Sequence, residues 1–137
     1  HGANSSQKKR NAAMAYVDGF IIPVPTFKRA DYLALAKMAA PIFMEHGALR
    51  VVECWGDDIA KGKLNDFRTA VIAEEGESIV FSWIEWPSKE ARDAGNAAAM
   101  ADPRMAVQDM PFSGARMIFS GFSVMVDTAA RPWATGQ

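Results

Sequence analysis

The segment from Ile79 to Trp86 is apolar on both sides of an extended chain, and it constrains the fold more than any other part of the sequence. Successive side chains of a β-strand point to opposite faces of a sheet. One face of this segment carries Phe81 and Trp83, and the other carries Val80 and Ile84. A sheet that is open to water on one side would alternate apolar and polar residues instead. We therefore expect a sheet whose two faces are both covered.

Three further strands are predicted from their β-branched and aromatic residues. The segment Leu49–Trp55 also has two apolar faces, since Val52 and Cys54 point away from the other apolar residues of that strand. The segments Tyr16–Val24 and Met117–Val126 are predicted as the first and last strands. Together with the segment before Trp86, they supply four strands for one sheet.

Two helices are predicted from the spacing of apolar residues and from the signals at their ends. The first runs from Ala30 to His46 and is followed by Gly47, a residue typical of helix C-termini, although it contains Pro41. The second begins after Ser88, a good N-cap residue, and runs to Ala101. Each helix therefore lies between two predicted strands.

The predicted order is strand, helix, strand, strand, helix, strand, with a short additional strand at Phe67–Ala73. This order is the split βαβ, or ferredoxin-like, arrangement of an α+β domain, in which two helices cover one face of an antiparallel sheet. The other face then needs a second sheet. An identical subunit related by a two-fold axis is the simplest source of that sheet, so we expect a homodimer.

Length and composition indicate one domain. The chain has 137 residues, of which 50% are hydrophobic and 23% charged, and its formal net charge is −1. We assign the domain to residues 14–127, a tag or upstream leader to residues 1–13 and a C-terminal tail to residues 128–137. The near-neutral charge argues against a nucleic-acid partner, and no apolar run is long enough to span a membrane. The single cysteine, Cys54, is expected to be a buried thiol in a cytoplasmic protein.

A series of short segments follows in a fixed order along the chain: Tyr16-Val17-Asp18-Gly19-Phe20, Pro23-Val24-Pro25, His46-Gly47-Ala48-Leu49-Arg50, Glu53-Cys54-Trp55-Gly56-Asp57-Asp58, Phe81-Ser82-Trp83-Ile84-Glu85-Trp86-Pro87, Arg92-Asp93, Asp102-Pro103-Arg104-Met105, Met110-Pro111-Phe112 and Arg116-Met117-Ile118. This series resembles a bacterial family catalogued as domain of unknown function 1428, from about Met14 to Asp127. The resemblance implies a dimeric α+β barrel, as in small antibiotic-biosynthesis-type monooxygenases and stress-responsive barrel proteins. It implies no particular reaction.

Three carboxylates lie on apolar predicted strands, namely Asp18, Glu53 and Glu85. A carboxylate that is buried without a partner is costly, so each should be paired, protonated or exposed to a wet cavity. In one interpretation they line a barrel pocket, where one of them acts as an acid or base. In the other interpretation they form ion pairs that fix the dimer. The arginines available for such pairs are Arg50, Arg92 and Arg116.

The tryptophans Trp55, Trp83 and Trp86 concentrate apolar area on neighbouring strands. They are candidates either for the wall of a ligand pocket or for the core and the dimer interface. Arg92 and Arg104 are candidates for a clamp on a carboxylate ligand, and surface or interface ion pairs are the alternative. The candidate pocket residues are Asp18, Glu53, Trp55, Trp83, Glu85, Trp86, Arg92 and Arg104.

His46 closes the first predicted helix, where a cation interacts favourably with the helix dipole. It is the only histidine outside residues 1–13, so we expect no metal site. The sequence also contains no phosphate-binding glycine run or other cofactor motif, and no cofactor is expected.

Three functions remain open, and the residues do not decide whether the protein is an enzyme. The one we favour is an uncharacterised homodimer that binds a small apolar or acidic molecule in a barrel pocket. The alternatives are a non-catalytic interaction or regulatory homodimer and a cofactor-independent monooxygenase-like enzyme, the latter by fold analogy alone. Binding of signal-recognition RNA, a label given to some relatives, is not expected, because the sequence has neither an RNA-binding motif nor a basic stripe.

Overall fold

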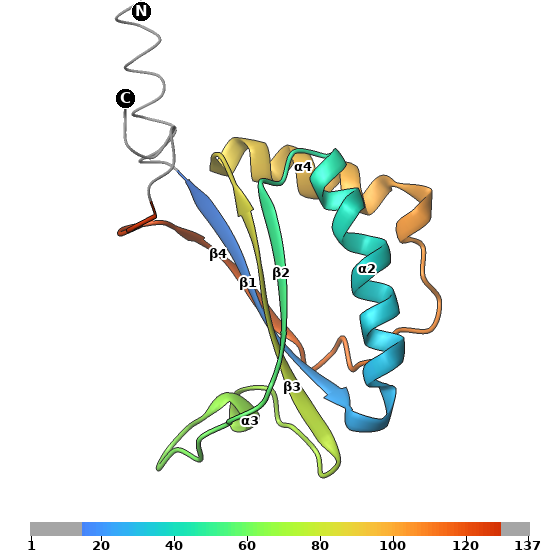
Figure 1. Ribbon diagram of the computed structural model, residues 1–137, viewed down its shortest axis with the longest axis vertical. Coiled ribbons are helices and arrows are strands. Elements are labelled where there is room, and N and C mark those ends of the chain that lie inside the picture. Colours follow the sequence, from blue (N-terminus) through green and yellow to red (C-terminus); the bar gives the residue numbers. More distant parts are fainter. Residues whose placement is uncertain (1–14, 130–137) are drawn as a thin grey trace, which may run out of the picture.

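The computed structural model describes residues 15–129, which form a four-stranded antiparallel sheet with two long helices on one side (Figure 1). The strands are β1 (Tyr16–Pro25), β2 (Arg50–Trp55), β3 (Glu77–Trp86) and β4 (Ile118–Ser123), and their order in the sheet is β2-β3-β1-β4. The helices are α2 (Arg29–Glu45), α3 (Phe67–Ala70) and α4 (Lys89–Ala101), with 3-10 turns η1 (Thr26–Lys28) and η2 (Pro103–Met105). The predicted α+β class is confirmed, and the order of elements is compatible with the ferredoxin-like arrangement. The predicted leader and most of the predicted tail lie outside the described residues.

The ends of the two long helices agree with the signals in the sequence. The hydroxyl of Ser88 accepts a hydrogen bond of 3.0 Å from the Ala91 N–H and caps α4. His46 is the C-cap of α2, and Gly47 follows with φ of +109°, a conformation that glycine adopts without strain. Helix α2 continues through Pro41, which lacks the N–H of an ordinary helical residue.

Two predicted strands differ from the structure. The segment predicted as a strand from Phe67 begins with the short helix α3, so that prediction was wrong. Asp66 explains the helical turn: its side chain accepts hydrogen bonds from the N–H groups of Arg68 and Thr69, and the Thr69 hydroxyl accepts one from the Asp66 N–H in return. The last strand is shorter than predicted, because pairing with β1 covers only Ile118–Ser123.

Helices α2 and α4 lie on one face of the sheet, and the core lies between them and the strands (Figure 1). Trp86 and Val24 have no exposed surface in this layer. Gly95 of α4 packs against Trp86 so closely that a Cβ atom at Gly95 would overlap the indole ring. The end of the sheet near Trp86 is therefore tightly packed.

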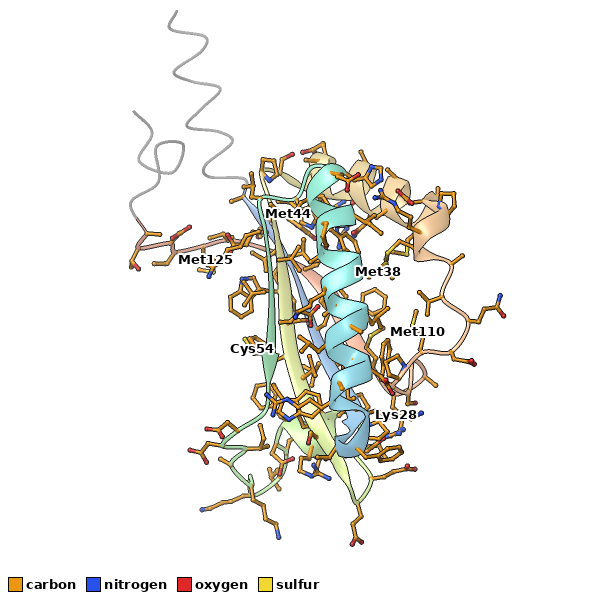
Figure 2. All side chains as sticks on the ribbon, turned by 45° about the vertical axis from the view of Figure 1, so that its right-hand side comes forward. Lys28, Met38, Met44, Cys54, Met110 and Met125 are labelled. Carbon is orange, nitrogen blue, oxygen red and sulfur yellow. The ribbon has the colours of Figure 1, made fainter. Side chains whose placement is uncertain are left out.

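We call the other face of the sheet the open face. Among residues 15–129, the only helix on this face is α3, near one end (Figure 1). The strand registers place these apolar residues on it: Val17, Ile21, Val52, Cys54, Phe81, Trp83, Ile118 and Phe122. Phe81 is 43% exposed and Phe122 58%. The expectation that Cys54 is buried was wrong, because Cys54 lies on β2 on the side turned away from α2 (Figure 2) and is exposed.

Candidate functional site

A cavity of about 200 Å³ lies between the sheet and α2. Most of its walls are apolar side chains from α2 and from the central part of the sheet. They include Leu35, Ala36, Ala39, Ala40 and Phe43 of α2 and Phe20, Ile22, Val51 and Ile84 of the sheet. A mostly apolar space with few polar groups is typical of small-molecule sites.

Methionines form another part of the wall: Met100 of α4, Met105 of η2, and Met110 and Met117 of the connection to β4. Figure 2 shows Met110 beside α2, on the connection that passes this helix. Methionine is unbranched and flexible, so such a wall adapts to ligands of different shapes. The cavity is therefore suited to an apolar molecule of variable outline.

Three polar side chains, Glu53, Tyr32 and Ser82, also line the cavity. The Tyr32 hydroxyl donates a hydrogen bond of 2.6 Å to Oε1 of Glu53. Tyr32 and Ser82 are buried, whereas Glu53 keeps part of its surface exposed, because β2 is an edge strand of the sheet. These groups converge on one point of an otherwise apolar wall.

The surroundings of Glu53 shift its acidity. Partial burial raises the pKa of this carboxyl, and hydrogen bonds from Tyr32 and Ser82 offset part of that rise. Burial, followed by the nearby Glu53 carboxylate, raises the pKa of Tyr32 far above the ordinary tyrosine range. Tyr32 therefore stays protonated and donates to Glu53, while Glu53 can accept a proton or a hydrogen bond from a ligand.

Asp18 lies on the same face of the sheet but in a closed environment, with only 2% of its surface exposed. Its carboxylate accepts hydrogen bonds of 2.9 Å from Trp86 Nε1, 2.9 Å from Arg92 Nε and 3.2 Å from Asn96 Nδ2. The Arg92 guanidinium also lies over the Tyr16 ring, with 4.9 Å between its central carbon and the ring centre. This cluster joins α4 to β1 and β3.

Trp83 and Glu85 lie on the open face. The Trp83 indole donates a hydrogen bond of 2.9 Å to Oε2 of Glu85, and Arg50 Nη1 lies 3.5 Å from the same oxygen. The Arg50 guanidinium also lies 5.9 Å from the centre of the Trp83 ring. These residues are therefore separated from Glu53 by the sheet itself.

Arg104 lies at the ends of the two long helices. It donates to Asp102 and to Glu45, and Nε2 of His46 lies 3.2 Å from Oδ2 of Asp102. Arg104 and Asp102 are therefore paired, at 2.7 Å. Hydrogen bonds from Arg104 hold the pKa of Asp102 well below its usual range. This network connects α2 to α4 and lines no part of the cavity.

The eight predicted pocket residues thus lie in four places. Glu53 lines the cavity, and Trp55 lies next to it on β2. Asp18, Trp86 and Arg92 form the closed cluster, Trp83 and Glu85 lie on the open face, and Arg104 belongs to the network at the helix ends.

The site residues predicted from the sequence did not include Tyr32, Ser82 or the methionines of the cavity wall. The sequence pattern could have indicated Tyr32, because this residue lies on the apolar face of the first predicted helix. Nothing in the local sequence sets the methionines of residues 100–117 apart. They come together only because the chain after α4 passes beside α2.

The family model described as protein of unknown function DUF1428 matches residues 15–114. The chain belongs to this family. It is 56% identical over 116 residues to the uncharacterized protein YbaA of Escherichia coli K12, and the alignment covers 83% of this chain and 99% of the relative. The YbaA proteins of Escherichia coli O157:H7 and Shigella flexneri match with the same identity and coverage.

This DUF1428 match ends at residue 114 and so includes Glu53, Tyr32, Ser82 and the whole of α2. Among residues 15–129, no helix is both long and apolar enough to cross a bilayer. The same residues contain no group of three or more His, Cys, Asp or Glu side chains placed to hold a metal ion.

Proposed function

We propose that this DUF1428 protein binds a small, mostly apolar molecule in the cavity between the sheet and α2, with Glu53 as the main polar contact. The observation that carries the proposal is the convergence of Glu53, Tyr32 and Ser82 on an apolar cavity of about 200 Å³. A carboxylate that served only to stabilise the fold would be expected to have a charged donor and little exposed surface, as Asp18 has. Glu53 has hydroxyl donors and open access from the edge of β2.

Ligand stabilisation tests this function. Diverse small aromatic and aliphatic compounds are added to the purified protein, and the thermal midpoint is measured. A compound at 100 times its dissociation constant should add about 2.7 kcal/mol to the free energy of unfolding. The variant Ala36→Leu, which places a larger side chain in the cavity, should abolish the shift. The control Ala30→Leu makes the same change at an exposed position of α2 and should preserve it.

Ligand binding in this cavity would be contradicted if no compound raised the thermal midpoint, or if the midpoint of Ala36→Leu rose as much as that of the native protein. The protein would then be better described as a non-catalytic interaction or regulatory homodimer. A cytoplasmic location is part of the proposal, because the single cysteine fits a reducing compartment.

We also propose that the protein functions as a homodimer in which the open faces of two subunits pack together. The support is the contiguous apolar surface on all four strands, since monomeric proteins rarely expose a large apolar patch. Phe67 of α3 extends this surface, with its ring centre 5.9 Å from that of Phe81. A two-fold axis would place the same patch on both sides of the interface.

Sedimentation at micromolar concentration tests the dimer. The native protein should sediment at twice the mass of the chain, whereas Phe81→Lys should give monomers because it places a charge in the centre of the interface. The control Leu64→Lys changes a side chain that is 99% exposed in the loop between β2 and β3 and should leave the dimer intact. A native protein that sediments as a monomer would contradict the proposal.

A further inference from the structure

A second hollow of about 220 Å³ adjoins the cavity along the edge strand β2. It shares Tyr32, Ala36 and Glu53 with the cavity and extends to Arg29 and Trp55. Arg29 is the first residue of α2, and Trp55 is the last residue of β2. A molecule seated in the cavity could therefore extend past Glu53 towards this pair.

Arg29 differs from the other arginines of residues 15–129. Its guanidinium lies over the Trp55 ring, with 5.2 Å between its central carbon and the ring centre, and its side chain has no carboxylate or carbonyl partner among residues 15–129. The others bind oxygen atoms: Arg50 that of Glu85, Arg68 those of Glu74 and Glu77, Arg92 that of Asp18, Arg104 those of Asp102 and Glu45, and Arg116 those of Glu77. The N–H groups of the Arg29 guanidinium are therefore available to bind a ligand.

A guanidinium with free N–H groups matches a carboxylate, because its planar fork can donate two parallel hydrogen bonds. The contact with the Trp55 ring restricts the Arg29 side chain, which reduces the entropy lost when a ligand binds. Trp55 is two residues from Glu53 on the same face of β2, a separation of roughly 6–7 Å along a strand. An anion at Arg29 would thus be held apart from the Glu53 carboxyl.

We propose that the ligand of this protein has an apolar body and a terminal carboxylate, and that Arg29, stacked on Trp55, binds this carboxylate at the mouth of the cavity. The proposal rests on the proposed function, because it takes the apolar body to occupy the cavity. It adds the class of ligand, an apolar carboxylic acid, and the direction in which the ligand lies.

Decanoate and its uncharged counterpart decanol test this proposal, with affinities measured by calorimetry on the full-length protein. Decanoate should bind more tightly than decanol to the native protein. Arg29→Gln should weaken decanoate binding about three- to tenfold and leave decanol unchanged. Arg29→Lys should restore only part of the affinity, because lysine keeps the charge and loses the fork.

Arg50→Gln is the matched control, since Arg50 also stacks on a tryptophan but is already paired with Glu85 on the open face. It should leave the affinity for both probes unchanged. Equal binding of both probes, with no effect of Arg29→Gln, would overturn the carboxylate site and leave the cavity function standing. If neither probe bound, or if both bound Ala36→Leu as well as the native protein, the proposed function would fail together with this inference.

Discussion

Two halves of the same layer, both between the sheet and its helices, are packed in different ways. In the half under α4, Asp18 is almost fully buried and satisfied by three donors, and Gly95 lies against Trp86 with no room for a methyl group. In the half under α2, Glu53 faces a cavity and receives its hydrogen bonds from hydroxyl groups.

The difference shows how one sheet face can serve two purposes. A carboxylate whose acceptor sites are filled by a guanidinium, an indole and an amide fixes the position of a helix. A carboxylate beside a cavity, with exposed surface at an edge strand, remains available for a ligand. Four predictions test this contrast between the half under α4 and the half under α2.

The largest effect is expected at Asp18. Asp18→Ala should lower the free energy of unfolding by about 3–5 kcal/mol, because Arg92 loses a buried partner and the Trp86 and Asn96 donors are left unsatisfied. Urea denaturation measures this loss. Asp93→Ala is the control: Asp93 also pairs with Arg92 but is half exposed, and its loss should cost less than about 1 kcal/mol. Equal losses of unfolding free energy in the two variants would contradict the view that burial makes Asp18 more important than the exposed Asp93.

Gly95→Ala should destabilise the protein by about 1–3 kcal/mol, although alanine is normally the better helix residue by up to about 1 kcal/mol. The added Cβ would overlap the Trp86 ring and lie 2.7 Å from the carbonyl oxygen of His46. The control Gly114→Ala adds a methyl group where no atom lies within 4 Å, and should change stability by less than about 0.5 kcal/mol. A stabilised Gly95→Ala would show that the α4 half is looser than described.

Ala36→Leu adds a larger side chain than Gly95→Ala, yet it should leave stability unchanged or raise it by up to about 2 kcal/mol, because the new atoms enter the cavity. Thermal unfolding of the ligand-free protein measures the change. A loss comparable with that of Gly95→Ala would mean that the α2 half has no usable space.

The smallest effect is the pH dependence contributed by Glu53. The raised pKa of Glu53 means that the folded state binds this proton more tightly than the unfolded state does. The protonated carboxyl therefore contributes to the free energy of unfolding at low pH, and this contribution is lost as the pH rises from about 4 through the pKa of the folded state. Relative to Glu53→Gln, the native protein should lose less than about 1 kcal/mol over this range, because Glu53 is partly exposed. NMR titration of the Glu53 carboxyl gives the pKa directly.

Glu77 supplies a comparison of opposite sign. Hydrogen bonds from Arg116 lower the pKa of Glu77, so its contribution is present above about pH 4 and is lost as the pH falls through the folded pKa. Relative to Glu77→Gln, the native protein should therefore lose stability towards low pH. Parallel pH profiles for the two variants would contradict the assignment of Glu53 to a desolvating cavity.

Local features of the sequence predict the elements of this fold well. Ser88 caps α4 and Gly47 ends α2 because each acts on backbone groups only a few residues away. The alternation of side chains also places Glu53 and Trp55 on one face of β2. The segment at Phe67 was assigned incorrectly because its β-branched and apolar residues suited a strand, while the capping box of Asp66 and Thr69 favoured a helical turn.

The candidate site depended on contacts that no local pattern contains. The donors to Asp18 lie 68, 74 and 78 residues away in the chain, and Tyr32 lies 21 residues from Glu53. Strand alternation states which residues share a face but not which face the helices cover. For this reason Trp83 and Glu85 could not be separated from Glu53 before the structure was known, and the exposure of Cys54 could not be predicted.

The sequence by itself determined the four strands and two long helices, the α+β class and the presence of more apolar sheet surface than two helices can cover. Only the tertiary structure decided that Asp18 is buried and hydrogen-bonded to three donors, whereas Glu53 faces a cavity. The physical reason is that helix ends and strand periodicity depend on neighbouring residues, whereas the burial and pairing of a carboxylate depend on side chains brought together from distant parts of the chain.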